Sequence, residues 1–149
     1  MKLLFASLIL ATSLLAFPKA GDPFPETVLP DQFGTQQRVT AGDKVVLISF
    51  EKGVSTAVND YLQGKPKTFL TTHYAKFISD ISPMPTLITK MFALPKMRDY
   101  GYPVLLIYDD AGKGFEKKEG MLSLYRLENG AVVSVDFVSP DALATVFGE

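Results

Sequence analysis

The chain has 149 residues, of which 47% are hydrophobic and 21% charged, and its formal net charge is −1. This length and balance predict one globular domain. Because the chain contains no cysteine, disulfides, thiolate nucleophiles and thiolate metal ligands are excluded, and the lack of a Lys/Arg run predicts no nucleic-acid partner.

The first twenty residues predict a secretory signal. Lys2 gives a positive start, and Leu3 to Phe17 form a nearly continuous apolar run of 15 residues. A bilayer crossing needs roughly 20 apolar residues, so a cleaved signal fits better than an anchor, which stays as the alternative. We expect cleavage after Ala20, a domain over residues 21–149, a periplasmic or secreted location, and no stable membrane insertion afterwards.

The first part of the domain predicts an extended segment and a buried strand. Residues 21–30 are rich in proline and should be extended, and residues 31–34, Asp-Gln-Phe-Gly, predict a turn. Val45 to Phe50 is a continuous apolar run, which is typical of a strand buried on both faces.

A helix should follow this strand. Ser55 is the predicted N-cap and Gly64 the predicted end. One apolar face is expected to carry Val58, Tyr61 and Leu62. A second strand is predicted over Ala75 to Ile81.

A second helix is predicted to begin at Ser82-Pro83. Five apolar residues follow the spacing of one helical face, which predicts that they pack in the core: Met84, Leu87, Ile88, Met91 and Phe92. The alternative is an adaptable apolar pocket lined by Met84, Met91, Met97, Met121 and Phe92. Pro95 should kink or split the helix.

The last third of the chain predicts a strand, a hairpin and a helix. Val104 to Tyr108 is apolar, and the pair Asn129-Gly130 is preferred in two-residue hairpin turns. Ser139-Pro140 is a typical helix start, with an inward face of Leu143, Val146 and Phe147. Strands alternate with helices and then form an antiparallel pair, so we expect a mixed sheet with helices on both faces.

The chain resembles thioredoxin-fold proteins of the peroxiredoxin or TlpA-like type over about residues 21 to 147. Five segments carry the resemblance: residues 21–25, 28–34, 45–50, 102–112 and the hairpin at 129–130 with the helix after it. The resemblance implies an α/β fold, a thioredoxin-like three-layer α/β/α arrangement with a mixed sheet and a C-terminal ββα unit.

The resemblance breaks at the position of the family's chemistry. It places Ser55 and Val58 where a thioredoxin carries its two cysteines and a peroxiredoxin its Thr and peroxidatic Cys. A helix N-terminus there would stabilise a thiolate, but this chain has none, so thiol peroxidase and disulfide oxidoreductase activities are excluded. The vestigial active-site loop contains Lys52, Gly53, Ser55 and Val58, which either bind a small anion or a partner's carboxylate or only connect strand to helix.

A second landmark of thioredoxins, a cis-proline facing the cysteines, has two possible positions. Tyr102-Pro103 precedes a strand and could supply it. We prefer the peroxiredoxin-like register, which puts the position near Met121-Leu122, where no proline occurs.

Other candidates for chemistry are weak. His73 is the single histidine and is expected on a loop or the surface, and Asp109-Asp110 fits a turn better than an acid/base pair or a calcium site. No phosphate loop, dinucleotide fingerprint or nucleophile elbow occurs. We predict no catalytic residue, no metal and no cofactor.

The sequence therefore favours an exported, cysteine-less thioredoxin-fold protein. Its expected role is non-catalytic binding of an envelope protein partner or a small ligand, as an accessory protein of the cell envelope. The alternative is an enzyme that uses Ser55, Lys52 or His73, or a borrowed cofactor. The two are distinguished by geometry: His73 and an acid within hydrogen-bond reach beside Ser55 in a concave site favour the enzyme, and a flat, apolar and exposed region favours the binding protein.

Overall fold

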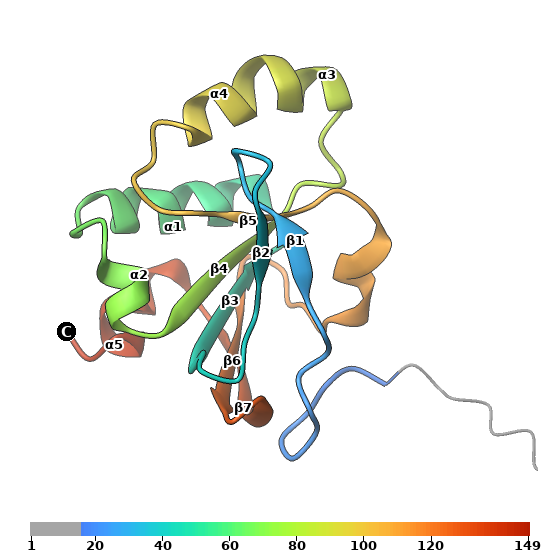
Figure 1. Ribbon diagram of the computed structural model, residues 1–149, viewed down its shortest axis with the longest axis vertical. Helices are drawn as coiled ribbons and strands as arrows, with labels where there is room; N and C mark the ends of the chain where they lie inside the picture. Colours follow the sequence, from blue (N-terminus) through green and yellow to red (C-terminus); the bar gives the residue numbers. More distant parts are fainter. Residues whose placement is uncertain (1–15) are drawn as a thin grey trace, which may run out of the picture.

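A computed structural model describes residues 16–149, drawn in Figure 1. Residues 1–15, most of the predicted signal, lie outside these residues, so neither the signal nor its cleavage after Ala20 is tested. Within residues 16–149 no helix has the length and apolar character needed to cross a bilayer.

A five-stranded mixed sheet forms the centre of the molecule, with strand order β5-β4-β3-β6-β7. Parallel pairing joins β3 to β4 and β4 to β5, and antiparallel pairing joins β3 to β6 and β6 to β7. The strands are β3 Val45–Ser49, β4 Ala75–Asp80, β5 Leu105–Ile107, β6 Leu122–Glu128 and β7 Ala131–Val138. This arrangement confirms the predicted thioredoxin-like α/β fold and its mixed sheet.

The central strand β3 is buried along its whole length, as its uninterrupted apolar sequence predicts. Because side chains alternate along a strand, Val45 and Leu47 pack on one face of the sheet while Val46 and Ile48 pack on the other. The molecule therefore has two apolar clusters, one on each side of the sheet.

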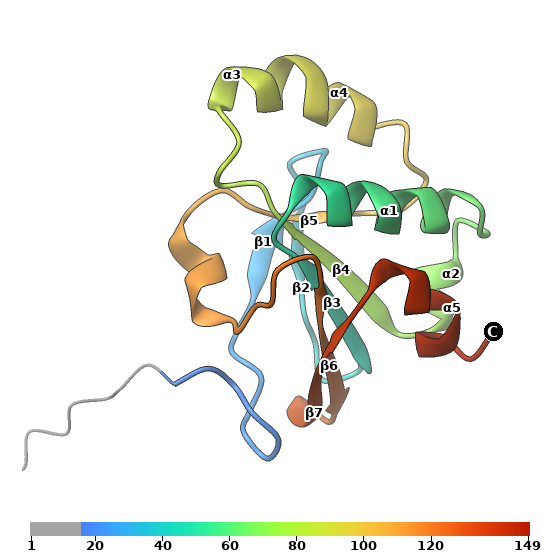
Figure 2. The same ribbon diagram turned by 180° about the vertical axis from the view of Figure 1, so that it is seen from behind.

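The first cluster lies under α1 Lys52–Gln63, α2 Phe69–Thr72 and α5 Leu143–Val146, the three helices on one face in Figure 2. Helix α1 buries Val54, Val58 and Leu62 there. The face predicted for this helix is thus confirmed, and so is Gly64 as its C-cap. The predicted N-cap Ser55 is wrong, because the helix begins at Lys52 and Glu51 is its N-cap.

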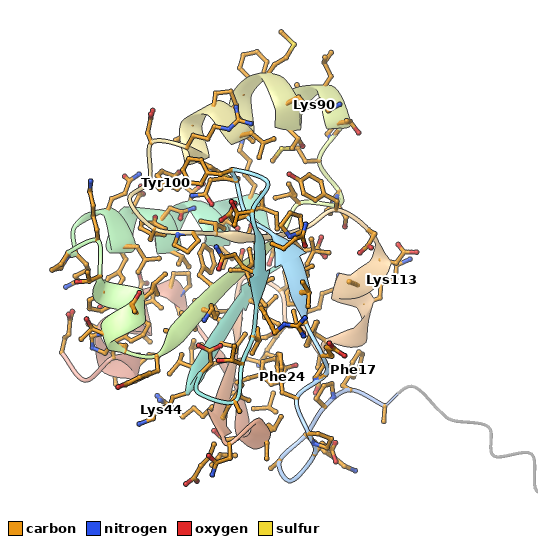
Figure 3. All side chains as sticks on the ribbon, viewed as in Figure 1. Phe17, Phe24, Lys44, Lys90, Tyr100 and Lys113 are labelled. Carbon is orange, nitrogen blue, oxygen red and sulfur yellow. The ribbon has the colours of Figure 1, made fainter. Side chains whose placement is uncertain are left out.

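The second face is covered by the N-terminal segment, the hairpin of β1 Val28–Pro30 and β2 Gln36–Arg38, and the 3-10 helix η2 Asp110–Gly114. Phe24, labelled in Figure 3, and Phe115 pack around Tyr125, with ring centroids 5.4 and 5.7 Å from the tyrosine ring. The layer on this side is therefore a hairpin with one short helix.

The C-terminal ββα unit matches the prediction closely. Asn129 and Gly130 have φ values of 50° and 81°, the positive values that a type I′ hairpin turn requires. The Ser139 side chain accepts a hydrogen bond from the Asp141 N–H at the start of η3 Pro140–Ala142, which leads into α5.

Between β4 and β5 runs a second helical rod, which we call the outer helix. It consists of α3 Thr86–Ile88, the π-helical turn η1 Thr89–Ala93 and α4 Leu94–Met97. The Leu94 N–H bonds to the Thr89 carbonyl, five residues back. Pro95 has no N–H to continue the α-helical ladder, so the interruption predicted at Pro95 is present as a π-turn.

The outer helix exposes apolar residues whose spacing predicts core packing. Four of them, called the apolar patch below, are Leu87, Ile88, Met91 and Phe92. Their side chains are between 42% and 66% exposed, whereas Thr89 is buried and Leu94 and Met97 pack against the first cluster. The prediction of core packing is wrong for these four residues, because the outer helix turns the side that carries Thr89, Leu94 and Met97 inward and leaves the other side uncovered.

The position of the outer helix is explained by the strand order. Crossovers between parallel strands are almost always right-handed, so two successive steps in one direction, from β3 to β4 to β5, place both helices on one face. Leu94 and Met97 accordingly join the same cluster as Val58. Since β5 has only three residues, little sheet is left to cover the outer helix, which forms the top of the molecule in Figures 1 and 2.

A buried glutamine ties the outer helix to the domain. The Gln32 Nε2 donates to the carbonyls of Tyr102 and Met97, at 2.8 and 3.2 Å, and its Oε1 accepts from the Val104 N–H at 2.8 Å. Arg98 adds a bond from its Nε to the Gln32 carbonyl, at 3.2 Å. The tip of the β1–β2 hairpin therefore holds the end of the outer helix and the start of β5 together.

Candidate functional site

A groove of about 500 Å³ separates the first half of α1 from the outer helix. This volume lies within the roughly 300–1,000 Å³ range of small-molecule sites. Residues of α1 form a polar wall: Lys52, Ser55, Thr56 and Asn59. The opposite wall is mostly apolar, with Pro83, Met84, Ile88, Phe92 and Met97, and Lys96 and Tyr100 add polar groups to it.

The floor of the groove lies at the carboxyl ends of β3 and β4, where Phe50, Ser79 and Asp80 contribute to the lining. Ligands of open α/β sheets bind outside the carboxyl ends of their strands. The groove thus occupies the place in the fold where a ligand site is expected.

Three serine hydroxyls form a chain beneath the first turn of α1. The Oγ atoms of Ser55 and Ser49 are 2.6 Å apart, those of Ser55 and Ser79 are 2.8 Å apart, and Ser49 donates to the Glu51 carbonyl at 3.1 Å. Each hydroxyl has one proton. Because Ser49 donates to a carbonyl, Ser55 must donate to Ser49, and Ser79 must donate to Ser55.

The direction of these hydrogen bonds determines whether Ser55 can act as a nucleophile. A serine nucleophile needs a base that accepts its proton, but the proton of Ser55 points to another hydroxyl, and the chain ends on a carbonyl oxygen. The hydroxyls satisfy one another where a thioredoxin-fold enzyme would hold its reactive sulfur. Their arrangement therefore fits a structural role.

The residues predicted for the vestigial loop are divided by the structure. Lys52 and Ser55 line the groove, Gly53 is exposed on the first turn of α1, and Val58 is buried in the core. The Glu51 carboxylate accepts from the Gly120 N–H at 2.6 Å, which joins the start of α1 to the approach to β6. Of the four predicted residues, Lys52 and Ser55 thus begin the polar wall of the groove, in the first turn of the helix.

His73 lies at the other end of α1, far from the serine chain. It comes directly after α2, and its Nδ1 donates to the Phe69 carbonyl at 2.8 Å. Its ring packs between Phe69 and Phe147, with centroid distances of 4.3 and 5.1 Å. The expected loop position is confirmed, since His73 lies in the turn between α2 and β4, where it is half-buried. No His–Ser pair exists for catalysis.

A charged contact closes the same end of α1. Glu149 accepts from the Tyr61 hydroxyl at 2.8 Å and from the Lys65 ammonium at 2.6 Å. The bond to Lys65, followed by the bond to Tyr61, lowers the pKa of Glu149, while burial and the contact with Glu149 raise the pKa of Tyr61 to about 12. These groups fasten the end of the chain to α1.

The remaining acidic candidates have local partners. The Asp109 carboxylate accepts from the Ala111 N–H at 2.9 Å, and Asp110 pairs with Lys113 at 3.2 Å on the surface, so both serve η2, as the turn interpretation predicts. Asp80 accepts from the Ser82 N–H at 3.0 Å, and a Cβ at Gly112 would collide with its carboxylate. Among residues 16–149 no cluster of His, Asp and Glu could hold a metal ion.

The two registers considered for the cis-proline are resolved. No peptide bond within residues 16–149 is cis, so the interpretation of Tyr102-Pro103 as a cis-proline is wrong. β6 begins at Leu122 and pairs Ser123 with Ile48 at the end of β3. The preferred register, with Met121-Leu122 beside the start of α1, is confirmed.

Several residues of this site have no signal in the sequence. Ser49 and Ser79 are buried at strand ends far apart in the chain, and Tyr102 donates to the Asn59 Oδ1 at 2.8 Å across 43 residues. Burial raises the pKa of Tyr102 well above its ordinary value, which keeps this hydroxyl a donor. In the sequence, the one sign of this site is that Ser49 is a polar residue within an apolar run.

Comparison with solved structures supports the fold. The structure is similar to peroxidoxin BcpB from Mycobacterium tuberculosis, with 20% identity, a TM-score of 0.57, and coverage of 87% of this chain and 94% of that one. It is also similar to the thioredoxin domain of a thiol-disulfide oxidoreductase from Bacteroides vulgatus, with 16% identity, a TM-score of 0.56, and coverage of 85% and 94%.

A third similar structure is a candidate thiol:disulfide interchange protein, DsbE, from Chlorobium tepidum, with 14% identity, a TM-score of 0.57, and coverage of 88% and 94%. No family model and no curated protein matches the sequence. At these identities the likeness concerns the fold. The chain has the thioredoxin-like fold of peroxiredoxin-type and thiol-disulfide proteins and no cysteine.

Proposed function

We propose that this protein is an exported, non-catalytic binding protein of the cell envelope, in which the groove between α1 and the outer helix receives a ligand or a segment of a partner. The observation that carries the proposal is the groove itself. It combines about 500 Å³ of space, one polar wall and one mostly apolar wall at the carboxyl ends of the central strands.

The chemistry of the groove supports binding over catalysis. Ser55 is engaged with Ser49 and Ser79, and His73 packs on aromatic rings beyond the far end of α1. Asp80 is the one carboxylate in the lining, beside the titratable groups of Lys52, Lys96 and Tyr100, and it already accepts a hydrogen bond from the Ser82 N–H. Apolar side chains with a few polar groups are typical of recognition sites.

Export is part of the proposal and depends on the charged start and apolar run before Ala20. The fold is compatible with it, since the packing of two apolar clusters holds the domain without disulfides. Fractionation of cells that produce the full chain, with the mass of the exported form, tests this part separately.

The groove is tested by site-specific photo-crosslinking. A photo-reactive amino acid replaces Met84 in the groove, and Val133 on β7 serves as the exposed control. We expect a discrete adduct, protein or small molecule, from the groove position alone. Equal crosslinking at Val133, or none at Met84, contradicts the proposal.

A steric variant provides a second readout. Thr56 is exposed and lines the groove, so Thr56→Phe should fill the space and abolish the adduct without unfolding the domain. Thr72→Phe, a matched exposed threonine at the end of α2, should leave the adduct unchanged. An adduct that survives Thr56→Phe places the binding elsewhere.

A further inference from the structure

The exposed apolar side chains of the molecule gather at one end. Large hydrophobic residues with exposed side chains number ten among residues 16–149, and four of them form the apolar patch within six consecutive positions of the outer helix. A concentration of this kind marks a binding surface, whereas single exposed apolar residues need no explanation.

Half of the patch lies outside the groove. Leu87 and Met91 do not line the groove, while Ile88 and Phe92 stand at its lip. Thr89, on the opposite side of the outer helix, is buried. The patch therefore points outward from the end of the molecule, where the outer helix is the outermost element in Figures 1 and 2.

The charges on the outer helix itself are positive. It carries Lys90 and Lys96, and Arg98 follows it, with no Asp or Glu between Ile81 and Arg98, whereas Asp80 and Asp99 flank this segment and the whole chain has a net charge of −1. Lys90 is labelled on the outer helix in Figure 3. An apolar helical surface flanked by Lys and Arg is complementary to an anionic lipid surface.

Aromatic side chains extend the same end of the molecule. Phe33, at the hairpin tip next to Gln32, is 56% exposed, and Tyr108, after β5, is 49% exposed. Arg98 bonds to the Gln32 carbonyl, which places the hairpin tip beside the end of the outer helix. Aromatic and basic residues around an apolar helix are typical of the membrane–water interface.

We propose that the outer helix binds reversibly to an anionic lipid surface, with the apolar patch at the acyl–headgroup boundary and Lys90, Lys96 and Arg98 among the headgroups. The helix spans residues 86–97, roughly 18 Å at 1.5 Å per residue, so it lies on the surface and does not cross it. A lipid surface is favoured over a protein partner because the exposed apolar side chains and the Lys and Arg side chains share one short helix, which is the pattern of interfacial helices on anionic lipid.

Vesicle co-sedimentation of the chain from Gly21 onward tests the proposal. We expect binding to vesicles of phosphatidylcholine and phosphatidylglycerol in equal parts, at least about tenfold weaker binding to pure phosphatidylcholine, and a loss of binding as salt increases. Absence of binding to the anionic vesicles at low salt overturns the proposal and assigns the patch to a protein partner.

Paired variants identify the surface. Leu87→Ser combined with Met91→Ser should weaken vesicle binding about tenfold or more, and Lys90→Glu combined with Lys96→Glu should weaken it several-fold. Val133→Ser, an exposed apolar residue on β7, should leave it unchanged. Equal binding by all variants overturns the proposal, and circular dichroism confirms that each variant is folded.

These variants distinguish lipid binding by the outer helix from the proposed binding in the groove. Leu87 and Met91 lie outside the groove, so Leu87→Ser with Met91→Ser should retain the photo-adduct at Met84. Thr56→Phe, which blocks the groove, should retain vesicle binding. A loss of both properties in either variant contradicts two separate surfaces.

Discussion

The two crossover helices of the sheet occupy equivalent places in the topology and differ in burial. Helix α1 packs Val58 and Leu62 into the core, where they are 1% and 2% exposed, while the outer helix leaves Leu87 and Met91 at 66% and 58%. Both sequences show apolar residues at helical spacing. Helical spacing alone therefore does not reveal whether a helical face is buried.

The difference is explained by the sheet beneath each helix. Helix α1 lies over the long strands at the centre of the sheet, and the outer helix precedes β5, which has three residues at the edge. The π-turn before Pro95 adds a rotation that brings Leu94 and Met97, but not Met91, to the core. The outer helix has little contact with the sheet, and hydrogen bonds from Gln32 help to hold it in place.

The largest expected effect separates the two helices by stability. Leu62→Ala should destabilise the fold by about 2–5 kcal/mol, because it leaves a cavity in a packed core. Leu87→Ala should change the free energy of unfolding by less than about 0.5 kcal/mol, because that side chain is exposed. Urea denaturation of both variants measures the difference, and equal losses would show that the outer helix packs its apolar face inward.

The next effect concerns the attachment of the outer helix. Gln32→Leu removes two buried hydrogen bonds and one partly buried one, and we expect a loss of about 2–4 kcal/mol. Amide hydrogen exchange should then increase in residues 86–97 before it increases in α1. Gln63→Leu, an exposed glutamine at the end of α1, is the control, and similar losses in both variants would contradict the role of Gln32.

A smaller effect tests the serine chain under α1. Ser55→Ala leaves the Ser79 donor and the Ser49 acceptor without a buried partner, which should cost about 1–3 kcal/mol. The photo-adduct in the groove should persist, because a structural serine is not required for binding. Ser82→Ala, on an exposed turn, controls for the substitution, and loss of the adduct in folded Ser55→Ala would favour a direct role in binding or catalysis.

The smallest effect is at the far end of α1. The folded-state pKa of Glu149 is lower than its ordinary value of 4.5, so its contacts with Lys65 and Tyr61 stabilise the fold above the ordinary value and are lost as the pH falls through the folded-state pKa. Glu149→Gln should lower the melting temperature slightly at neutral pH and not at all in strong acid. Thermal scans across this range check the sign, and a difference that grows in acid would contradict it.

Local patterns predict most of the fold. The apolar run of β3, the Asn129-Gly130 turn and the Ser139-Pro140 helix start are each encoded within a few residues, so the sheet and the closing unit can be predicted from the sequence. The absence of cysteine excludes thiol chemistry on composition alone.

The candidate site can be predicted only in part. The family pattern indicates Lys52 and Ser55, but the groove needs the outer helix beside α1, and Ser55 meets Ser79 across 24 residues while Gln32 meets Tyr102 across 70. The hydrophobic periodicity of a sequence does not indicate contacts between residues so far apart in the chain. The same pattern assigns Val58 to the site, yet Val58 faces the sheet because it shares the inner side of α1 with Leu62.

The exposure of the outer helix is the claim on which the comparison of the two helices and the lipid-binding proposal depend, and a chain without cysteine offers a direct test. Single variants Met91→Cys and Val58→Cys are labelled with a thiol reagent under native conditions. Met91→Cys should react at a rate close to that of the unfolded chain, and Val58→Cys should react slower by about 10³-fold or more, because its thiol is reached only through unfolding. Equally slow labelling of both would contradict the account.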